Sequence, residues 1–243
     1  MLRLISYAVV SAAFLVGGGA LVAFGVFLFV GPLKIVAFGI GDKGALLVDT
    51  GLSLLFFIQH SGMIRKSSRR RVIRLLPEAY FSALYAIASG LVLMVVVLLW
   101  QKTDTVVAEA DGMPYWALRL LFLVAVGGFY WGSSTLGSFD PFGGRAIIKH
   151  LRSAKPKPMP FTVKGPYRWV RHPLYFFTLL MIWTSPHLTA DRLLFNVLWT
   201  AWLVVGSILE ERDLVETFGD EYRQYQSEVP MLIPINPADL KQM

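Results

Sequence analysis

The sequence predicts an all-α integral membrane protein, a polytopic bundle of about six transmembrane helices with a C-terminal cytoplasmic helical segment. Of its 243 residues, 55% are hydrophobic and only 16% are charged, and the mean hydropathy is +0.57. Several apolar runs are long enough to cross a hydrocarbon core of about 30 Å, which takes roughly 20 helical residues. This composition excludes a disordered tail and an ordinary water-soluble domain.

Six apolar runs account for the predicted helices. The four longest runs are Tyr7–Val30, Leu46–Ile64, Ala79–Trp100 and Trp116–Leu136. Two shorter runs, Leu174–Leu188 and Leu193–Leu209, are separated by the polar stretch Thr189–Arg192, which predicts a helical hairpin with a turn there. A signal peptide is the alternative for the first run, but that run exceeds the usual apolar core of a signal peptide and further spans follow it.

The basic residues predict the orientation. Arg65–Arg74 contains six Lys and Arg residues and Arg145–Arg171 contains eight, so both connections are expected in the cytoplasm. Gly31–Ala45 has only two lysines, and Gln101–Tyr115 is acidic, so both are expected outside. Six spans with cytoplasmic N- and C-termini satisfy all four connections.

We expect a single domain, residues 1–243. Residues 1–136 hold the first four spans, and residues 137–243 hold a connector, the hairpin and the C-terminal motifs. The proline-rich stretch Lys155–Pro160 predicts a stiff, extended connector.

The hairpin predicts where a polar site forms, because antiparallel neighbours bring the start of one helix to the end of the next. Arg168–Tyr175 should therefore meet Glu210–Asp213. Pro173 suits the first turn of a helix and places His172 at the cap. The amide donors of that helix start, with Arg168 and Arg171, predict a site for a carboxylate or phosphate.

A basic cluster opposite an acidic pair suits a zwitterionic ligand that carries a carboxylate, an amino group and sugar hydroxyls. S-adenosylmethionine is such a ligand. Aromatic faces that could stack on its adenine or contact its sulfonium surround the cluster: Tyr167, Trp169, Tyr175, Tyr222 and Tyr225. An aromatic belt with snorkelling arginines is the structural alternative.

Cysteine and histidine usage narrows the chemistry. The chain has no cysteine, which excludes disulfides, thiolate metal sites and cysteine nucleophiles, and its four scattered histidines show no metal-ligand spacing. His60 lies in a predicted span beside Gln59 and Ser61, where an ionisable group suggests a function. The alternative is that His60 lies near the cytoplasmic interface, partly hydrated, and has no functional role. His150 and His187 are expected at the surface.

Two other patterns have structural interpretations. Arg65–Arg74 could attract nucleic acid, but cytoplasmic retention and contact with lipid headgroups explain the run, so we expect no nucleic-acid partner. Gly17–Gly19 favours close helix approach or bending, because it does not follow a strand as a nucleotide-binding loop would.

The last third of the chain carries a family pattern. It consists of Gly165–Tyr175 with Arg171-His172-Pro173-Leu174-Tyr175, then Glu210-Glu211, Phe218-Gly219, Tyr222, Tyr225 and Val229–Pro234. This combination closely resembles the isoprenylcysteine carboxyl methyltransferase and phospholipid methyltransferase superfamily. Gln59–Arg65 and Phe139–Arg145 resemble its methanethiol S-methyltransferase branch. Ser138–Pro141 departs from that branch, and Phe177 stands where the superfamily commonly has Gly, which would narrow a lipid entrance and favour a small acceptor.

The resemblance implies an enzyme, a membrane methyltransferase that uses S-adenosylmethionine and releases S-adenosylhomocysteine, in a bacterial inner membrane. It implies that Gly165–Tyr175 and Glu210-Glu211 bind the cofactor, without saying which glutamate contacts it. The cofactor residues expected are Tyr167, Arg168, His172, Pro173, Tyr175, Glu210, Glu211, Tyr222 and Tyr225.

The favoured acceptor is a small thiol, methanethiol, which would become dimethyl sulfide. A thiolate nucleophile needs a positive neighbour or a base, and the candidates for this catalytic role are His60, Arg145 and Arg171. A prenylcysteine carboxylate and a phospholipid amine are alternative acceptors. A sterol-type reductase and a non-catalytic membrane subunit are the remoter alternatives.

Overall fold

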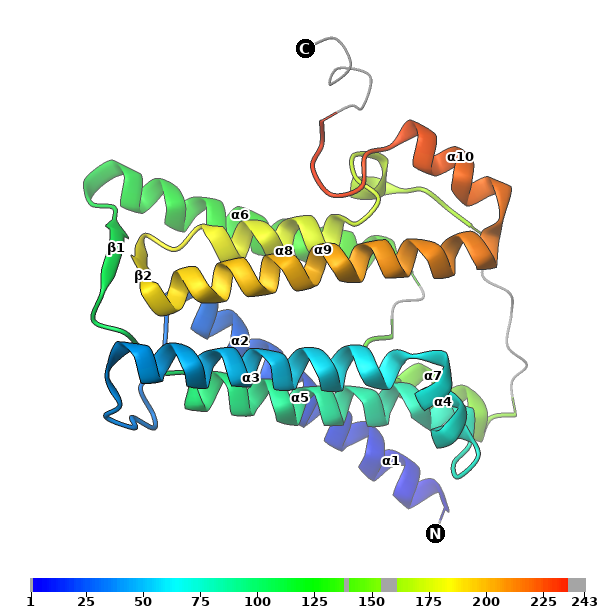
Figure 1. The fold of residues 1–243 in the computed structure, drawn as a ribbon. Helices are drawn as coiled ribbons and strands as arrows, with labels where there is room; N and C mark the ends of the chain where they lie inside the picture. The colour runs from blue at the N-terminus through cyan, green and yellow to red at the C-terminus, as the bar shows by residue number, and fades with distance from the viewer. Residues whose placement is uncertain (1, 138–139, 154–160, 236–243) are drawn as a thin grey trace. The chain divides into compact units, whose positions relative to one another are not determined.

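The computed structural model of the chain describes residues 2–137, 140–153 and 161–235. Figure 1 shows that this part of the chain is almost entirely helical. Its α-helices are α1 Leu2–Ala12, α2 Gly19–Val30, α3 Gly41–Ile64, α4 Lys66–Ile73, α5 Phe81–Leu99, α6 Gly112–Thr135, α7 Gly144–Leu151, α8 Pro173–Trp183, α9 Ala190–Phe218 and α10 Asp220–Glu228. Shorter helices are η1 Ala13–Gly18, a π-helix, and the 3₁₀ turns η2 Glu78–Tyr80 and η3 Gly165–Arg168.

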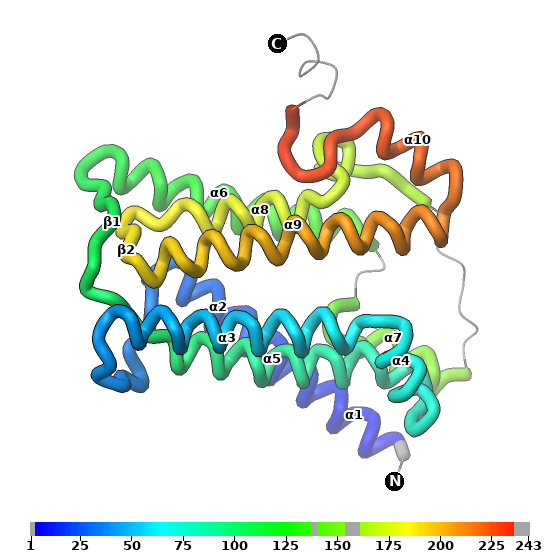
Figure 2. The backbone as a smooth tube through the Cα atoms, viewed as in Figure 1, coloured from blue at the N-terminus to red at the C-terminus, as the bar shows by residue number. Residues whose placement is uncertain are grey.

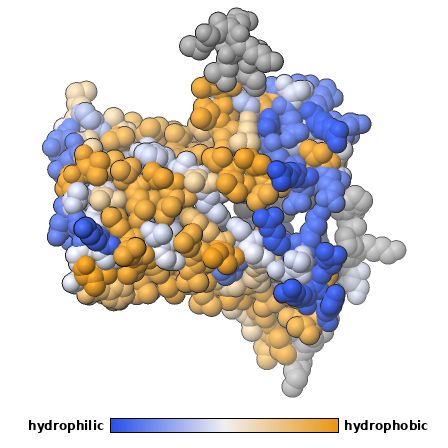
Figure 3. Space-filling view, in the orientation of Figure 1, coloured by the Kyte–Doolittle hydropathy of each residue, from blue (hydrophilic) through white to orange (hydrophobic). Residues whose placement is uncertain are grey.

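The predicted membrane architecture is confirmed. Within the described residues, five helical segments are long and apolar enough to cross a membrane: Arg3–Val30, Gly41–Ile64, Glu78–Leu99, Gly112–Thr135 and Ala190–Phe218. The shorter apolar helix α8 is the sixth member that the sequence predicted. On the face drawn in Figure 3, hydrophobic residues cover the long helices, and many of their large apolar side chains are exposed, as a lipid-facing surface requires.

The hairpin between α8 and α9 differs in detail from the prediction. α8 ends at Trp183 rather than at Leu188, because Ser185-Pro186 follows and the residue before a proline avoids helical backbone angles. The chain then forms the strand β2 His187–Thr189, which pairs with β1 Val106–Glu109 in a two-stranded sheet that the sequence did not predict.

The predicted polar turn Thr189–Arg192 is wrong in a second respect, because Asp191 and Arg192 are buried in the first turn of α9. Asp191 accepts hydrogen bonds from the Trp100 indole at 3.2 Å and from the Thr103 amide at 2.9 Å. Arg192 donates to the carbonyl oxygen of Leu28 at 2.8 Å. Their polarity serves partners far away in the sequence rather than solvent.

The chain divides into two compact units, which we describe separately. Unit 1 comprises the described residues of 1–108, 140–157 and 188–195, and unit 2 those of 109–139, 158–187 and 196–243. The predicted connector Lys155–Pro160 and the motif residues Ser138 and Phe139 lie outside the described residues.

Unit 1 is packed around α5, which lies against α2, α3 and η1. A Cβ atom at Gly90 would come within 2.9 Å of the Gly17 Cα, and one at Gly17 would come within 3.1 Å of the Phe142 ring. The predicted role of Gly17–Gly19 in close helix approach is therefore confirmed at Gly17. Asp140 accepts a hydrogen bond from the Ala146 amide at 3.0 Å, which gives a partner to an amide in the first turn of α7.

Unit 2 is built on α6, α8 and the part of α9 from Asn196 onward (Figure 1), with α8 packed on α6 and hydrogen-bonded to α9. The Phe177 ring fills the space over Gly128 of α6, where a Cβ would lie only 2.2 Å from the ring. Two hydrogen bonds show that α8 and α9 run antiparallel. The Trp183 indole donates to the Thr200 hydroxyl near the end of α8, and the Tyr175 hydroxyl donates to Glu210 near its start. This arrangement brings the predicted cofactor motifs of unit 2 together.

Candidate functional site

The start of α8 has the local structure that its sequence predicts. His172 is the cap residue and Pro173 occupies the first turn, where its missing N–H leaves no partner unsatisfied. The preceding turn η3 begins at Gly165 with φ +53, where a Cβ would lie 2.8 Å from the Thr135 hydroxyl. Glycine is therefore required at this position, which sets the course of the chain into α8.

The centre of the site is a buried ion pair between Arg171 and Glu211. The Arg171 Nε lies 2.6 Å from one Glu211 carboxylate oxygen and its Nη2 lies 3.1 Å from the other, a two-pronged contact. The two side chains are 9% and 11% exposed. The predicted meeting of Arg168–Tyr175 with Glu210–Asp213 is confirmed by this contact.

Glu211 is saturated by its neighbours. Gln226 donates to it from Nε2 at 2.8 Å, the His172 Nε2 lies 3.3 Å away, and the Tyr222 hydroxyl donates at 3.5 Å. These contacts and the two from Arg171 use both carboxylate oxygens. The geometry gives Glu211 an organising position at the junction of α8, α9 and α10.

Glu210, the adjacent acid, has a different environment. Its side chain is 47% exposed, and it accepts a hydrogen bond from the Tyr175 hydroxyl at 2.8 Å. The His172 Nδ1 lies 3.7 Å from the Glu210 carboxylate, and the His172 ring is stacked on the Tyr175 ring with a centroid distance of 5.4 Å. The Glu210 carboxylate is therefore accessible to solvent and lies beside the stacked rings of His172 and Tyr175.

The C-terminal segment Gln226–Met231 packs against the basic residues Arg171 and His172. The Arg171 amide donates to the Pro230 carbonyl at 2.9 Å, and the His172 amide donates to the Met231 carbonyl at 3.1 Å. The Arg171 Nη1 donates to the carbonyl oxygens of Gln226 and Val229. The predicted anion site therefore loses the amides of residues 171 and 172 to the protein's own backbone.

A sharp turn after α9 returns α10 to the site. Figure 2 shows the chain doubling back between the two helices. Gly219 occupies that turn with φ 59 and ψ −128, angles that only glycine adopts readily. As a result, Tyr222, Tyr225 and Gln226 lie on one face of α10, and the two tyrosines are buried.

The tyrosines of the site are held as neutral hydroxyl groups. Burial raises the pKa of Tyr222, and the Glu211 charge raises it further. Burial likewise raises the pKa of Tyr225, whose hydroxyl donates to the Tyr167 carbonyl oxygen. Burial, then the Glu210 charge, raises the pKa of Tyr167. All three hydroxyls therefore remain protonated hydrogen-bond donors at neutral pH.

Unit 2 also places the less central predicted residues. Arg168 is exposed at the end of η3. Trp169 is 56% exposed and its ring meets the Trp131 ring edge-on at 5.0 Å, which supports the aromatic-belt alternative for this residue.

The other two predicted catalytic residues belong to unit 1. His60 lies on α3 with its ring 5.0 Å from the Phe56 ring and 5.0 Å from the Tyr85 ring. Arg145 is exposed in the first turn of α7. Unit 1 therefore holds His60 in an aromatic surrounding, and Arg145 at a surface.

Sequence reasoning missed two members of the unit 2 site. Gln226 was overlooked although it lies four residues after Tyr222 and so shares its helical face. Phe161 contacts Phe218, Tyr222 and Tyr225, with the three centroid distances between 5.3 and 5.9 Å. It lies between the Phe139–Arg145 and Gly165–Tyr175 motifs, and no local signal in the sequence marks it. The described residues hold no group of three or more His, Asp or Glu side chains suited to a metal ion.

Comparison with known proteins assigns the family. The family described as NnrU protein matches residues 50–232, a range that includes Gln59–Arg65, Gly165–Tyr175 and Glu210-Glu211. The chain belongs to the NnrU family. This NnrU chain is 38% identical over 191 residues to a methanethiol S-methyltransferase of Pseudomonas deceptionensis, covering 78% of this chain and 73% of the relative. It is 31% identical over 226 residues to a methanethiol S-methyltransferase of Mycobacterium tuberculosis, covering 88% and 91%.

A third relative, the methanethiol S-methyltransferase of Pseudomonas sp. strain GM41(2012), is 38% identical over 195 residues, covering 78% of this chain and 74% of the relative. The resemblance found in the sequence is therefore confirmed for the NnrU chain. No solved structure matches it significantly.

Proposed function

We propose that this protein is a membrane-embedded methyltransferase that transfers a methyl group from S-adenosylmethionine to a small thiol. Methanethiol is the favoured acceptor, and dimethyl sulfide is then the product. The observation that carries the proposal is the similarity, over 78% to 88% of the chain, to proteins named methanethiol S-methyltransferase. Methyltransferase homology implies a methyl donor. The carboxylate and aromatic side chains of the unit 2 site suit S-adenosylmethionine in that role.

The unit 2 site fits a zwitterionic nucleoside on its open side. Glu210 supplies an accessible carboxylate for an amino group or for ribose hydroxyls, and the stacked rings of His172 and Tyr175 supply an aromatic surface. Glu211 has no capacity left, because Arg171, His172, Gln226 and Tyr222 surround it. We assign cofactor contact to Glu210 and the holding of the site to Glu211.

The remaining predicted cofactor residues divide in the same way. Tyr222 and Tyr225 anchor α10 and the turn around Tyr167, so they support the site's shape. Pro173 is the first residue of α8 and so fixes His172 at the cap position. Arg168 is exposed and available to a carboxylate of the ligand.

The reaction places few demands on protein chemistry. S-adenosylmethionine, when bound, supplies a methyl group already activated by its sulfonium, so alignment and exclusion of water are the main contributions of the chain. A thiol with a pKa near 8.5 must also lose its proton to become the nucleophile. His60 and Arg145 are the proposed groups for that step. Arg171 already donates to Glu211 and to two carbonyl oxygens, which favours a positioning role for it.

The acceptor can be tested directly. Purified protein is mixed with methyl-labelled S-adenosylmethionine and separately with methanethiol, a prenylated cysteine and phosphatidylethanolamine, and labelled products are measured. We expect labelled dimethyl sulfide from methanethiol. Methylation of either lipid-like acceptor with none of methanethiol would refute the thiol assignment, and absence of cofactor binding by folded protein would favour the non-catalytic alternative.

Variants separate the two halves of the reaction. Glu210→Gln should weaken cofactor binding about tenfold or more, since a charge-assisted contact is lost. Glu216→Gln, which changes an exposed acid further along α9, is the matched control and should bind as the parent does. His60→Ala should keep cofactor binding and reduce turnover. Isothermal calorimetry measures binding, and headspace chromatography measures turnover.

A further inference from the structure

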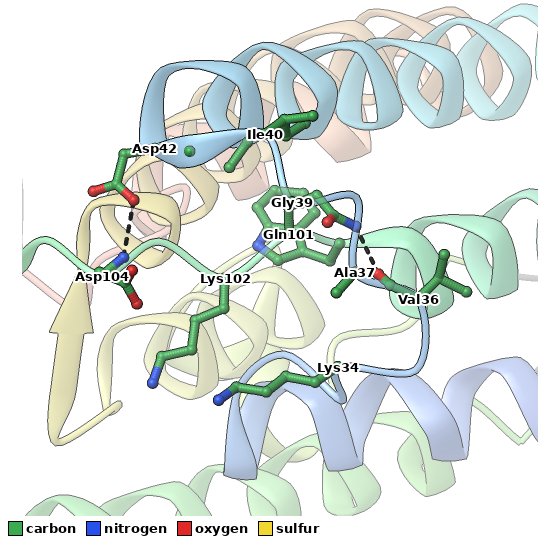
Figure 4. A pocket seen from close by; sticks show the side chains of 12 residues that line it. Lys34, Val36, Ala37, Gly39, Ile40, Asp42, Gln101, Lys102 and Asp104 are labelled. Carbon is green, nitrogen blue, oxygen red and sulfur yellow. Dashed lines mark hydrogen bonds between the residues drawn. The ribbon is translucent and has the colours of Figure 1, made fainter.

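A cavity of about 300 Å³ lies in unit 1, away from the residues assigned above. Its walls are the connection between α2 and α3 with the start of α3, from Lys34 to Ala45, and the segment Trp100–Asp104 that follows α5. Figure 4 shows this cavity with its lining side chains. The cavity lies at the start of α3, whereas the basic helix α4 follows the other end of α3.

Hydrogen bonds hold the two walls in place. The Gln101 side chain donates to the Val36 carbonyl at 2.9 Å and accepts from the Phe38 amide at 2.9 Å. Asp42 accepts from the backbone amides of Asp104 and Thr105, both at 3.0 Å. The α2–α3 connection is therefore tied to the segment after α5 at both edges of the cavity, so the cavity is preformed.

Two cationic side chains lie at the cavity. Figure 4 shows Lys34 on one wall and Lys102 on the other, with their side chains extending toward the same side of the cavity. Both residues are exposed, and neither forms an ion pair with a described residue. The lining acid Asp42 is engaged by the amides named above, and Asp104 is the second acid of the lining. A phosphate bound at the cavity would pair with both ammonium groups.

The surroundings of the lysines are apolar. Ile35 is 59% exposed, Phe38 is 45% exposed and Ile40 is 43% exposed, all on the α2–α3 connection. The connection joins two membrane-spanning helices, so its side chains lie where the hydrocarbon core meets the headgroup layer. A ligand for this place therefore needs a phosphate for the lysines and hydrocarbon for the exposed side chains.

We propose that this cavity binds the headgroup of a phospholipid, with the phosphate between Lys34 and Lys102 and the acyl chains against the exposed apolar side chains of residues 35–40. The site is separate from the methyl-transfer site and does not depend on the proposed function. A free phosphate would satisfy the lysines but leave the apolar surface uncovered. A neutral diacylglycerol would cover that surface but leave the lysines unpaired.

Native mass spectrometry of the full chain in detergent tests the proposal. The probes are phosphatidylglycerol, diacylglycerol with the same acyl chains, and inorganic phosphate. We expect the protein to retain phosphatidylglycerol in preference to both others. Lys34→Gln and Lys102→Gln should each lower that retention about tenfold, as the loss of one charge-assisted contact predicts.

Lys43→Gln is the matched control, because Lys43 is an exposed lysine in the first turn of α3 that does not line the cavity. It should retain phosphatidylglycerol as the parent does. Thermal unfolding in lipid-free detergent should be the same for all three variants, since each changes an exposed side chain. The proposal is overturned if Lys34→Gln combined with Lys102→Gln retains the lipid fully, if diacylglycerol is retained equally, or if inorganic phosphate binds as well as the lipid does.

Discussion

Adjacent residues of identical chemistry can have opposite roles, and Glu210 and Glu211 illustrate this. Neighbouring residues of a helix point about 100° apart, so one acid of α9 faces α8 and α10 while the other faces solvent. Glu211 accordingly meets Arg171, His172 and Gln226. Glu210 contacts the edge of the cluster through the Tyr175 hydroxyl and the His172 ring.

This difference predicts that the same substitution affects stability strongly at Glu211 and hardly at all at Glu210. Glu211→Ala leaves the buried guanidinium of Arg171 without its partner, which should cost about 3–5 kcal/mol of folding free energy. Glu210→Ala removes an exposed side chain and should leave stability within about 0.5 kcal/mol of the parent. Thermal unfolding in detergent measures both. Equal destabilisation by the two variants would contradict the division of roles.

At the scale of elements, α8 is held in unit 2 by the shape of α6. The Phe177 ring occupies the space that Gly128 leaves open, and Leu174 lies over Gly132 one turn away. Small residues on one helix that receive large residues from its neighbour are the usual means of close packing between membrane helices. Phe177 is the residue that departs from the superfamily pattern, and its ring is buried against α6. This packing explains its size, so a narrowed lipid entrance is not needed as the explanation.

Gly128→Ala should destabilise the protein by about 1–3 kcal/mol, because the new methyl group overlaps the Phe177 ring. Gly127→Ala is the matched control, since a Cβ there has no heavy atom within 4 Å among the described residues. That variant should be neutral or slightly stabilising, as alanine favours helix. Combining Gly128→Ala with Phe177→Leu should recover part of the loss. Unfolding midpoints in detergent check all four proteins, and a control as damaging as Gly128→Ala would count against the packing argument.

At the scale of the whole molecule, the distribution of charge sets how the chain enters a membrane. Arg65–Arg74 has six basic residues, while the connection that contains β1 carries Asp104, Glu109 and Asp111 against Lys102 alone. The orientation with cytoplasmic termini stays a prediction from this asymmetry.

Reporter fusions test that orientation in bacterial cells. Green fluorescent protein fused after Met243 should fluoresce, because it matures in the cytoplasm, and alkaline phosphatase inserted after Asp104 should be active, because it requires the periplasm. The same phosphatase inserted after Arg70 should be inactive and serves as the control. The opposite pattern of activity would reverse the predicted topology.

The sequence by itself determined the membrane-spanning helices and the meeting of Arg171 with Glu211. Apolar length defines a helix that can cross a bilayer, and an antiparallel pair brings Arg171 to Glu211 whatever else the chain does. The tertiary structure alone decided that the Glu211 carboxylate is fully hydrogen-bonded while Glu210 is accessible. It also decided that Asp191 and Arg192 are buried, and that Gln226 and Phe161 lie in the candidate site. Those features depend on partners up to 165 residues away, such as Phe27 for Arg192, and a polar side chain does not reveal in its own neighbourhood whether such a partner exists.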